Sequence, residues 1–243
     1  MCLLIVKPAN VEIPFSHLQN AADSNPHGAG VAIADGGKSP LIRKNHAWGA
    51  DELAEELDKH KGHPALVHFR YATHGGTNLE NTHPFKLENG WSAAHNGIIS
   101  DVETLPGESD TRAFLRLHVD PWIKNGGTME RKDILEWIGK KVGGNNKLAF
   151  LHADGRHSIA NEDSGHWRDG VWYSNTSYQE TLWGRFSRAS RSRFDPHEWT
   201  PHELKYLTCS ECSRRITSGA FLTSACGDVL CEDCYSIKTE YYL

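Results

Sequence analysis

The chain has 243 residues, enough for one large domain or for one medium-sized domain with a small second module. It carries 31 acidic against 26 basic residues, a net charge of −5, which does not favour nucleic acid as a partner of the whole chain. No apolar run approaches the roughly 18 residues of a membrane span. The N-terminal segment 1–14 lacks the basic region of a signal peptide, so we expect a cytoplasmic protein.

Apolar runs bounded by turn residues predict the elements of the first half of the chain. Residues 50–60 form an amphipathic helix in this prediction, because their apolar side chains fall on one face. Asn89-Gly90 predicts a hairpin turn, since both residues tolerate a positive φ. Strands are predicted, in chain order, at 2–6, 28–34, 64–70, 84–87 and 91–95.

The second half begins with helical patterns and returns to strands. Helices are predicted at 111–119 and 129–141, from apolar residues that recur every three or four positions. Strands follow at 147–152, 156–161 and 171–174. Because strands stand before and after a block of helices, the pattern favours an α+β layered domain over an alternating parallel one.

The composition changes near residue 184. The segment GRFSRASRSRFDPHEWT is rich in arginine and serine and poor in aliphatic residues, which is typical of a linker. We therefore predict a first domain at 2–183, a linker at 184–202 and a small cysteine-rich module at 203–243.

Cys2 stands apart from the other five cysteines, which all lie in the last 35 residues. Removal of Met1 would leave Cys2 with a free α-amine, whose usual pKa of about 7.7–8.0 suits a general base for the neighbouring thiol. One residue would then supply both nucleophile and base. Taken alone, Cys2 could equally be a small buried apolar residue.

Four short motifs follow Cys2 along the chain: NPHGAG at 25–30, HFRYATHG at 68–75, HNGI at 95–98 and SDT at 109–111. In order and spacing they resemble the class II glutamine amidotransferases, whose glutaminase domain belongs to the N-terminal nucleophile hydrolases. The resemblance covers residues 2 to about 180. It implies a four-layer αββα sandwich, L-glutamine as the substrate, and catalysis without a cofactor.

The resemblance also implies the catalytic residues. The Cys2 thiolate would attack the side-chain amide of glutamine, release ammonia and leave a thioester for water to hydrolyse. Asn96 and the backbone N–H of Gly97 would stabilise the oxyanion. By itself, Asn96-Gly97 could be only a turn.

The glutamine-binding residues follow in the same way. Arg70 would bind the α-carboxylate as a planar bidentate donor, and Asp110 would bind the α-ammonium group. Arg70 could otherwise be a surface charge, and Asp110 could be a helix N-cap, alone or in addition. The pocket would further be lined by Thr73, His74 and Gly75, with His83 as another candidate.

The C-terminal cysteines form two pairs, Cys209-x2-Cys212 and Cys231-x2-Cys234, with 18 residues between them. This spacing predicts a structural Zn²⁺ site of four thiolates in a zinc-ribbon or treble-clef-like module. Free thiols or disulfides are the alternative. Cys226 could replace one ligand, but a packed thiol is the preferred interpretation.

Three functions remain open from the sequence. The first is a glutaminase subunit that passes ammonia to a separate synthase or ligase, because no ATP-binding or sugar-phosphate motif is evident. The second is a free-standing amidase acting on a γ-glutamyl or related amide. The third is a zinc-module adaptor with an inactive glutaminase fold. A linker cluster could contact the phosphates of a nucleic acid or nucleotide, although a solvated linker is preferred; it comprises Arg185, Arg188, Arg191 and Arg193.

Overall fold

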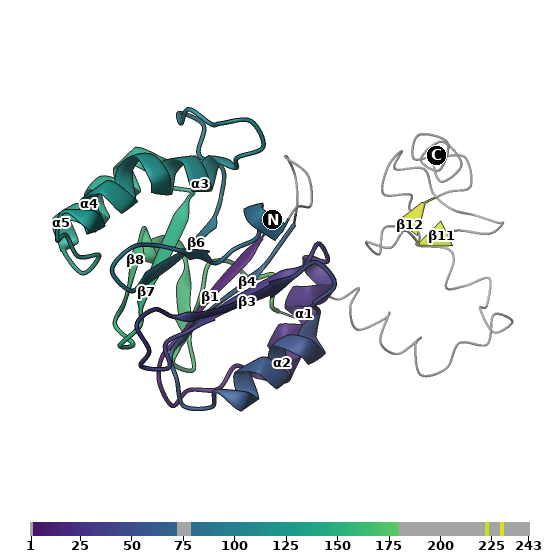
Figure 1. The fold of residues 1–243 in the computed structure, drawn as a ribbon. Coiled ribbons are helices and arrows are strands. Elements are labelled where there is room, and N and C mark those ends of the chain that lie inside the picture. Colours follow the sequence, from purple (N-terminus) through teal and green to yellow (C-terminus); the bar gives the residue numbers. More distant parts are fainter. Residues whose placement is uncertain (1, 72–78, 180–221, 224–228, 231–243) are drawn as a thin grey trace, which may run out of the picture. The chain divides into compact units, whose positions relative to one another are not determined.

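The computed structural model describes residues 2–71 and 79–179, together with the backbone of two short strands near the C-terminus (Figure 1). The chain divides into two compact units, Met1–Glu180 and Thr181–Leu243. In the second unit, β11 (Leu222–Thr223) pairs with β12 (Val229–Leu230) in antiparallel fashion. The predicted linker and the four predicted zinc ligands lie outside the described residues, so they stay predictions.

Two antiparallel sheets form the centre of the first unit. The six-stranded sheet has the order β3-β2-β4-β1-β10-β9, and the four-stranded sheet has the order β5-β6-β7-β8. The strands of the first sheet are β1 (Leu3–Lys7), β2 (Ala29–Ile33), β3 (Leu41–Asn45), β4 (Ala65–Phe69), β9 (His166–Arg168) and β10 (Val171–Tyr173). Those of the second are β5 (Phe85–Lys86), β6 (Trp91–Asn96), β7 (Lys147–His152) and β8 (His157–Ala160).

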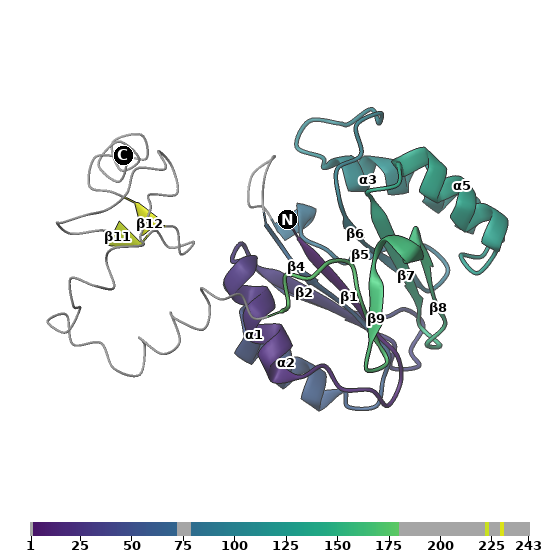
Figure 2. The same cartoon turned by 180° about the vertical axis from the view of Figure 1, so that it is seen from behind.

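Helices cover the outer face of each sheet (Figures 1 and 2). The six-stranded sheet is covered by α1 (Phe15–Ser24) and α2 (Ala50–Lys59). The four-stranded sheet is covered by α3 (Asp110–Phe114), a π-helical turn η2 (Leu115–Val119), α4 (Asp120–Lys124) and α5 (Lys132–Val142). Two 3-10 turns, η1 (Leu79–Asn81) and η3 (Glu162–Ser164), complete the described elements. Of the helices that the structure describes, none has the length and apolar character that crossing a bilayer requires.

The alternation of side chains along β1 shows how the layers are held together. Leu3 and Ile5 pack with the residues of α1 and α2, whereas Leu4 and Val6 point the other way. Leu4 and Val6 join a third apolar cluster that includes Ala149 of the four-stranded sheet. Both faces of the six-stranded sheet are therefore buried, one by helices and one by the second sheet, which gives four layers.

The predicted α+β class is confirmed, with differences in several elements. The helix predicted at 129–141 begins at Lys132, and the helix predicted at 111–119 continues through η2 and α4 to Lys124. Helix α1 and strands β3 and β9 were not predicted. Helix α1 follows Pro14 without a side-chain cap or an acidic first turn, so the usual start signals are missing.

The pairing of β1 determines where the ends of several strands meet. Leu3 pairs with Phe69 of β4, and Ile5 pairs with Tyr173 of β10, both in antiparallel register. The residue before β1 therefore lies beside the residues that follow β4 and β10. Figure 1 shows the beginning of β1 at the same edge of the layered unit as the end of β6 and the beginning of α3.

Candidate active site

Cys2 immediately precedes β1 and is partly buried. The backbone N–H of Tyr71 donates a hydrogen bond to its Sγ over 3.3 Å, and Sγ lies 3.5 Å from the Tyr71 carbonyl oxygen. The Asn175 side chain donates to the Cys2 carbonyl over 2.8 Å. Burial raises the pKa of the Cys2 thiol above its usual value, although the Tyr71 N–H and the Arg70 cation act in the opposite direction. At neutral pH the thiol is therefore protonated, and attack on a substrate requires a base.

Asn96, the last residue of β6, is held by a residue of the other sheet. Its Nδ2 donates to Ser174 Oγ over 2.8 Å, and the backbone N–H of Leu4 donates to the same oxygen over 2.9 Å. Ser174 N–H in turn donates to the Leu4 carbonyl over 2.9 Å. Because an amide nitrogen has two hydrogens, this contact orients Asn96 and leaves its second N–H for another acceptor.

Gly97 follows Asn96 in a conformation that favours glycine. Its φ is +147°, and a Cβ atom placed here would lie 2.0 Å from Asn146 Oδ1. A side chain at this position would therefore displace Asn146 and turn the local backbone. The predicted Asn96-Gly97 pair thus lies in a turn whose shape depends on a glycine.

Arg70 follows β4 and is only 7% exposed. Its backbone N–H donates to the Gly28 carbonyl over 2.9 Å, and its own carbonyl accepts from His27 N–H over 3.0 Å. The NPHGAG segment therefore supports the backbone at Arg70. Burial lowers the pKa of Arg70 from its ordinary value, while the neighbouring Cys2 raises it, and a guanidinium group keeps its charge in proteins.

Asp110 is the first residue of α3 and is half-buried. Its carboxylate accepts hydrogen bonds from the backbone N–H groups of Ile99 and Thr111, each over 2.7 Å. The N-cap of the helix is Ser109, whose Oγ accepts from Arg112 N–H over 3.3 Å. The suggestion that Asp110 is the N-cap is therefore wrong. Its carboxylate instead links α3 to the segment that follows Gly97.

The structure thus brings Cys2, Arg70 and Asn96 to the meeting strand ends, and ties Asp110 to the adjoining turn. Thr73, His74 and Gly75 lie outside the described residues. Ser174 and Asn175 were missed, although a polar pair directly after an apolar strand could have suggested them. In the described ranges, no group of three or more His, Cys, Asp or Glu residues is placed to hold a metal ion.

Three of the described histidines are buried: His68 on β4, His95 on β6, and His83. His83 Nδ1 lies 3.0 Å from His68 Nε2, and the His83 ring also packs against Phe85. Burial lowers the pKa of His68 to about 3 and that of His95 to about 4, and it holds that of His83 well below its ordinary value. All three are therefore neutral at physiological pH. His83, a candidate pocket residue from the sequence, belongs to this cluster.

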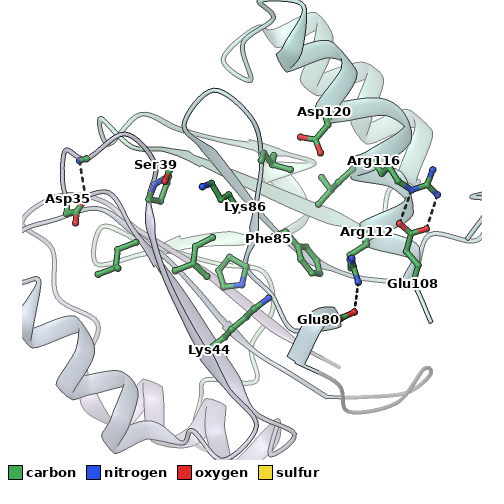
Figure 3. Close-up of a pocket in the computed structure, with 17 residues that line it drawn as sticks. Asp35, Ser39, Lys44, Glu80, Phe85, Lys86, Glu108, Arg112, Arg116 and Asp120 are labelled. Atoms are coloured by element: carbon green, nitrogen blue, oxygen red, sulfur yellow. Dashed lines mark hydrogen bonds and ion pairs between the residues drawn. The ribbon is translucent and has the colours of Figure 1, made fainter. Parts of the chain in front are cut away.

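A cavity of about 900 Å³ lies elsewhere, between β3 and β5 (Figure 3). Its lining includes Lys44 and Phe85 together with two ion pairs, Arg112 with Glu80 at 3.4 Å and Arg116 with Glu108 at 2.8 Å. Of the residues predicted for catalysis or glutamine binding, none of those that the structure describes lines it. The cavity is therefore separate from the candidate active site.

Comparison with known proteins identifies the family. Residues 1–168 match the family described as glutamine amidotransferases class-II. Because the match spans more than half of the chain, the chain belongs to the class II glutamine amidotransferases.

The sequence identity to individual relatives is low. The chain is 28% identical over 148 residues to a glutamine–fructose-6-phosphate aminotransferase of Buchnera aphidicola, covering 56% of this chain and 24% of that protein. It is 25% identical over 173 residues to a putative glutamine amidotransferase of Haemophilus influenzae, covering 63% of this chain and 58% of that protein. The chain thus spans only part of the length of these relatives.

Solved structures give weak matches. A glutamine phosphoribosylpyrophosphate amidotransferase from Bacillus subtilis aligns with a TM-score of 0.40 at 18% identity, over 73% of this chain and 42% of that chain. A glutamine aminotransferase class-II domain protein from Silicibacter pomeroyi aligns with a TM-score of 0.38 at 18% identity, over 71% and 87%.

The buried histidines predict that stability falls as the solution becomes acidic. Because their pKa values are lowered in the folded state, the unfolded chain binds more protons once the pH drops below about 6.5. The free energy of unfolding should decrease from pH 6.5 towards pH 5, with each histidine approaching about 1.4 kcal/mol per pH unit. Urea unfolding at a series of pH values measures this slope.

Two substitutions separate the buried histidines from other titrating groups. His83→Gln should reduce the slope, because one lowered pKa is removed, whereas His46→Gln at an exposed position should leave it unchanged. A free energy of unfolding that stays constant between pH 6.5 and pH 5 would contradict the prediction.

Proposed function

We propose that the Met1–Glu180 unit hydrolyses the side-chain amide of L-glutamine to glutamate and ammonia, with Cys2 as the nucleophile. The observation that carries this proposal is the convergence of Cys2, Arg70 and Asn96 at one edge of two facing sheets, in a chain of this family. The described layers are consistent with an N-terminal nucleophile hydrolase sandwich.

The reaction begins with the α-amine of Cys2 after Met1 has been removed. The amine accepts the thiol proton, and Sγ forms a bond to the amide carbon of glutamine. This base is needed because burial favours the neutral thiol. Among the described residues no histidine hydrogen-bonds to Cys2, whose hydrogen bonds are to Tyr71 and Asn175.

The resulting oxyanion would be bound by the free N–H of the Asn96 side chain and by the Gly97 backbone N–H. Donors of this kind contribute about 3 kcal/mol each to transition-state stabilisation. The α-amine then returns its proton to the leaving nitrogen, the C–N bond breaks, and ammonia departs. Water attacks the remaining thioester, which releases glutamate and restores the thiol.

The ends of the substrate are charged, and two charged residues would bind them. Arg70 would form a bidentate pair with the α-carboxylate, and Asp110 would pair with the α-ammonium group. The segment that contains Thr73, His74 and Gly75 directly follows Arg70 and would complete the pocket.

We further propose that the ammonia passes to a separate synthase or ligase subunit. In the aminotransferase of Buchnera aphidicola the matched segment covers only 24% of the protein, so that relative carries further chain beside its amidotransferase domain. The C-terminal cysteine module, with a structural Zn²⁺, would be the docking surface for that partner.

Cys2→Ala should abolish glutamine hydrolysis, because Cys2 is the only cysteine of the Met1–Glu180 unit. The wild-type chain should also react covalently with the glutamine analogue 6-diazo-5-oxo-norleucine, and Cys2→Ala should not. Intact mass spectrometry measures both the adduct and the loss of Met1. Chains that retain Met1 should remain unlabelled. Turnover of glutamine by Cys2→Ala would exclude this nucleophile.

Arg70→Lys should raise the KM for glutamine about tenfold or more, because an ammonium group does not form the planar bidentate pair with a carboxylate. The matched control is Arg43→Lys on β3, whose side chain is 54% exposed and should leave the KM unchanged. Steady-state kinetics of ammonia release measure the effect. An unchanged KM in Arg70→Lys would remove Arg70 from the substrate site.

The full chain should contain one zinc ion, which native mass spectrometry detects. Cys209→Ser should lose the ion, because a four-thiolate site lacks a spare ligand. Cys226→Ser is the matched control and should retain it, since Cys226 is the C-terminal cysteine outside the two pairs. Retention of zinc by Cys209→Ser, or its loss from Cys226→Ser, would require another ligand set.

A further inference from the structure

His95 lies on β6 beside Asn96, is 1% exposed, and makes one side-chain contact through each ring nitrogen. Its Nε2 lies 2.9 Å from Asn146 Oδ1, and its Nδ1 lies 2.8 Å from Thr111 Oγ1. We propose that His95 is a positioning residue that fixes two parts of the glutamine site at once: the Gly97 turn through Asn146, and the Asp110 carboxylate through Thr111. This inference rests on the proposed function.

The contacts determine which ring nitrogen carries the hydrogen. Asn146 Nδ2 donates to the Val142 carbonyl over 2.6 Å, so Asn146 Oδ1 is the acceptor that faces His95. His95 Nε2 must therefore carry the hydrogen. Burial keeps the ring neutral by lowering its pKa to about 4, so Nδ1 is an acceptor and the Thr111 hydroxyl donates to it.

This tautomer affects Asp110, because a hydroxyl group has a single hydrogen. Thr111 Oγ1 lies 3.3 Å from Asp110 Oδ1 but only 2.8 Å from His95 Nδ1. With its hydrogen directed to His95, the hydroxyl ties Thr111 to β6, and the Thr111 backbone N–H in turn donates to Asp110 Oδ1 over 2.7 Å. The carboxylate keeps its backbone contacts to Ile99 and Thr111 and retains acceptor positions for an ammonium group.

The contact from His95 to Asn146 acts on the Gly97 turn. Asn146 is fixed on two sides, because Asn161 Nδ2 donates to its carbonyl over 2.7 Å while its side chain contacts His95 and Val142. Its Oδ1 occupies the space next to Gly97, where a Cβ atom would lie at 2.0 Å. If Asn146 were displaced, the backbone at Gly97 could shift, and the direction of the Gly97 N–H would no longer be fixed.

Two substitutions of His95 separate its two contacts. We call the contact to Thr111 the Asp110 arm and the contact to Asn146 the oxyanion arm. His95→Gln places an N–H near the position of Nε2, so it keeps the contact to Asn146 and loses the acceptor for Thr111. His95→Asn places an oxygen near the position of Nδ1, so it keeps the acceptor for Thr111 and loses Asn146. Thr111→Val removes the Asp110 arm alone with little change of volume.

The two arms have different kinetic signatures. Loss of the Asp110 arm weakens binding in the ground state and the transition state alike, so His95→Gln and Thr111→Val should raise the KM for glutamine about tenfold with kcat within about twofold. Loss of the oxyanion arm acts in the transition state, so His95→Asn should lower kcat about tenfold with little change in KM. Ser92→Ala is the matched control, because it removes a buried hydrogen bond from the same strand at 3.1 Å and should change neither constant.

The tautomer gives a readout that does not depend on turnover. In the full chain labelled with ¹⁵N-histidine, the ring nitrogens of His95, assigned by their loss in His95→Gln, should show the Nε2–H form. An Nδ1–H form would overturn the proposal, and so would equal changes of kcat and KM in both His95 variants. If the wild-type chain neither hydrolyses glutamine nor labels at Cys2, the proposed function fails, while the tautomer still tests the two contacts of His95.

Discussion

The antiparallel pairing of β1 with β4 on one side and with β10 on the other is the constraint on which the active site depends. A nucleophile that carries its own amine must stand at a chain terminus, and termini are usually poorly ordered. Here Leu3, the residue next to Cys2, pairs with β4, and β10 pairs on the other side of the same strand at Ile5 and Val6. Tyr71 after β4 and Asn175 after β10 then hold Cys2 directly through its thiol and its carbonyl. The sheet thus gives a terminal residue the fixed position that catalysis requires.

The second sheet contributes through polar contacts that cross the layers. Ser174 accepts from Leu4 on β1 and from Asn96 on β6, so one oxygen links the strand that follows Cys2 to the proposed oxyanion residue. Buried polar groups of this kind stabilise a fold only when each is satisfied. The neutral state of His95, whose two ring nitrogens both have partners, fits the same requirement, because a buried charge would be costly.

The sequence predicted the parts of this arrangement that depend on local patterns. Alternating or continuous apolar residues indicated most strands, and the motifs after Cys2 indicated Arg70, Asn96 and Asp110. Helix α1 was not predicted because it lacks start signals, and strand β3 was not predicted because it is half exposed. The form of both elements therefore depends on tertiary contacts. The supporting residues were missed for a related reason. Ser174 contacts a residue 78 positions away and Asn146 one 51 positions away, separations that no local pattern encodes.

The protonation state of Cys2 connects the fold to the type of catalysis. A cysteine hydrolase that uses a histidine base lowers the pKa of its thiol through an imidazolium neighbour. In the part of the chain that the structure describes, the three buried histidines bond to one another or to Thr111 and Asn146, and burial keeps them neutral. The Tyr71 N–H and the Arg70 cation offset part of the burial of the thiol, but its pKa stays raised. Among the residues that the structure describes, the base left for the proposed reaction is the amine of Cys2 itself, so we expect removal of Met1 to be a condition of activity.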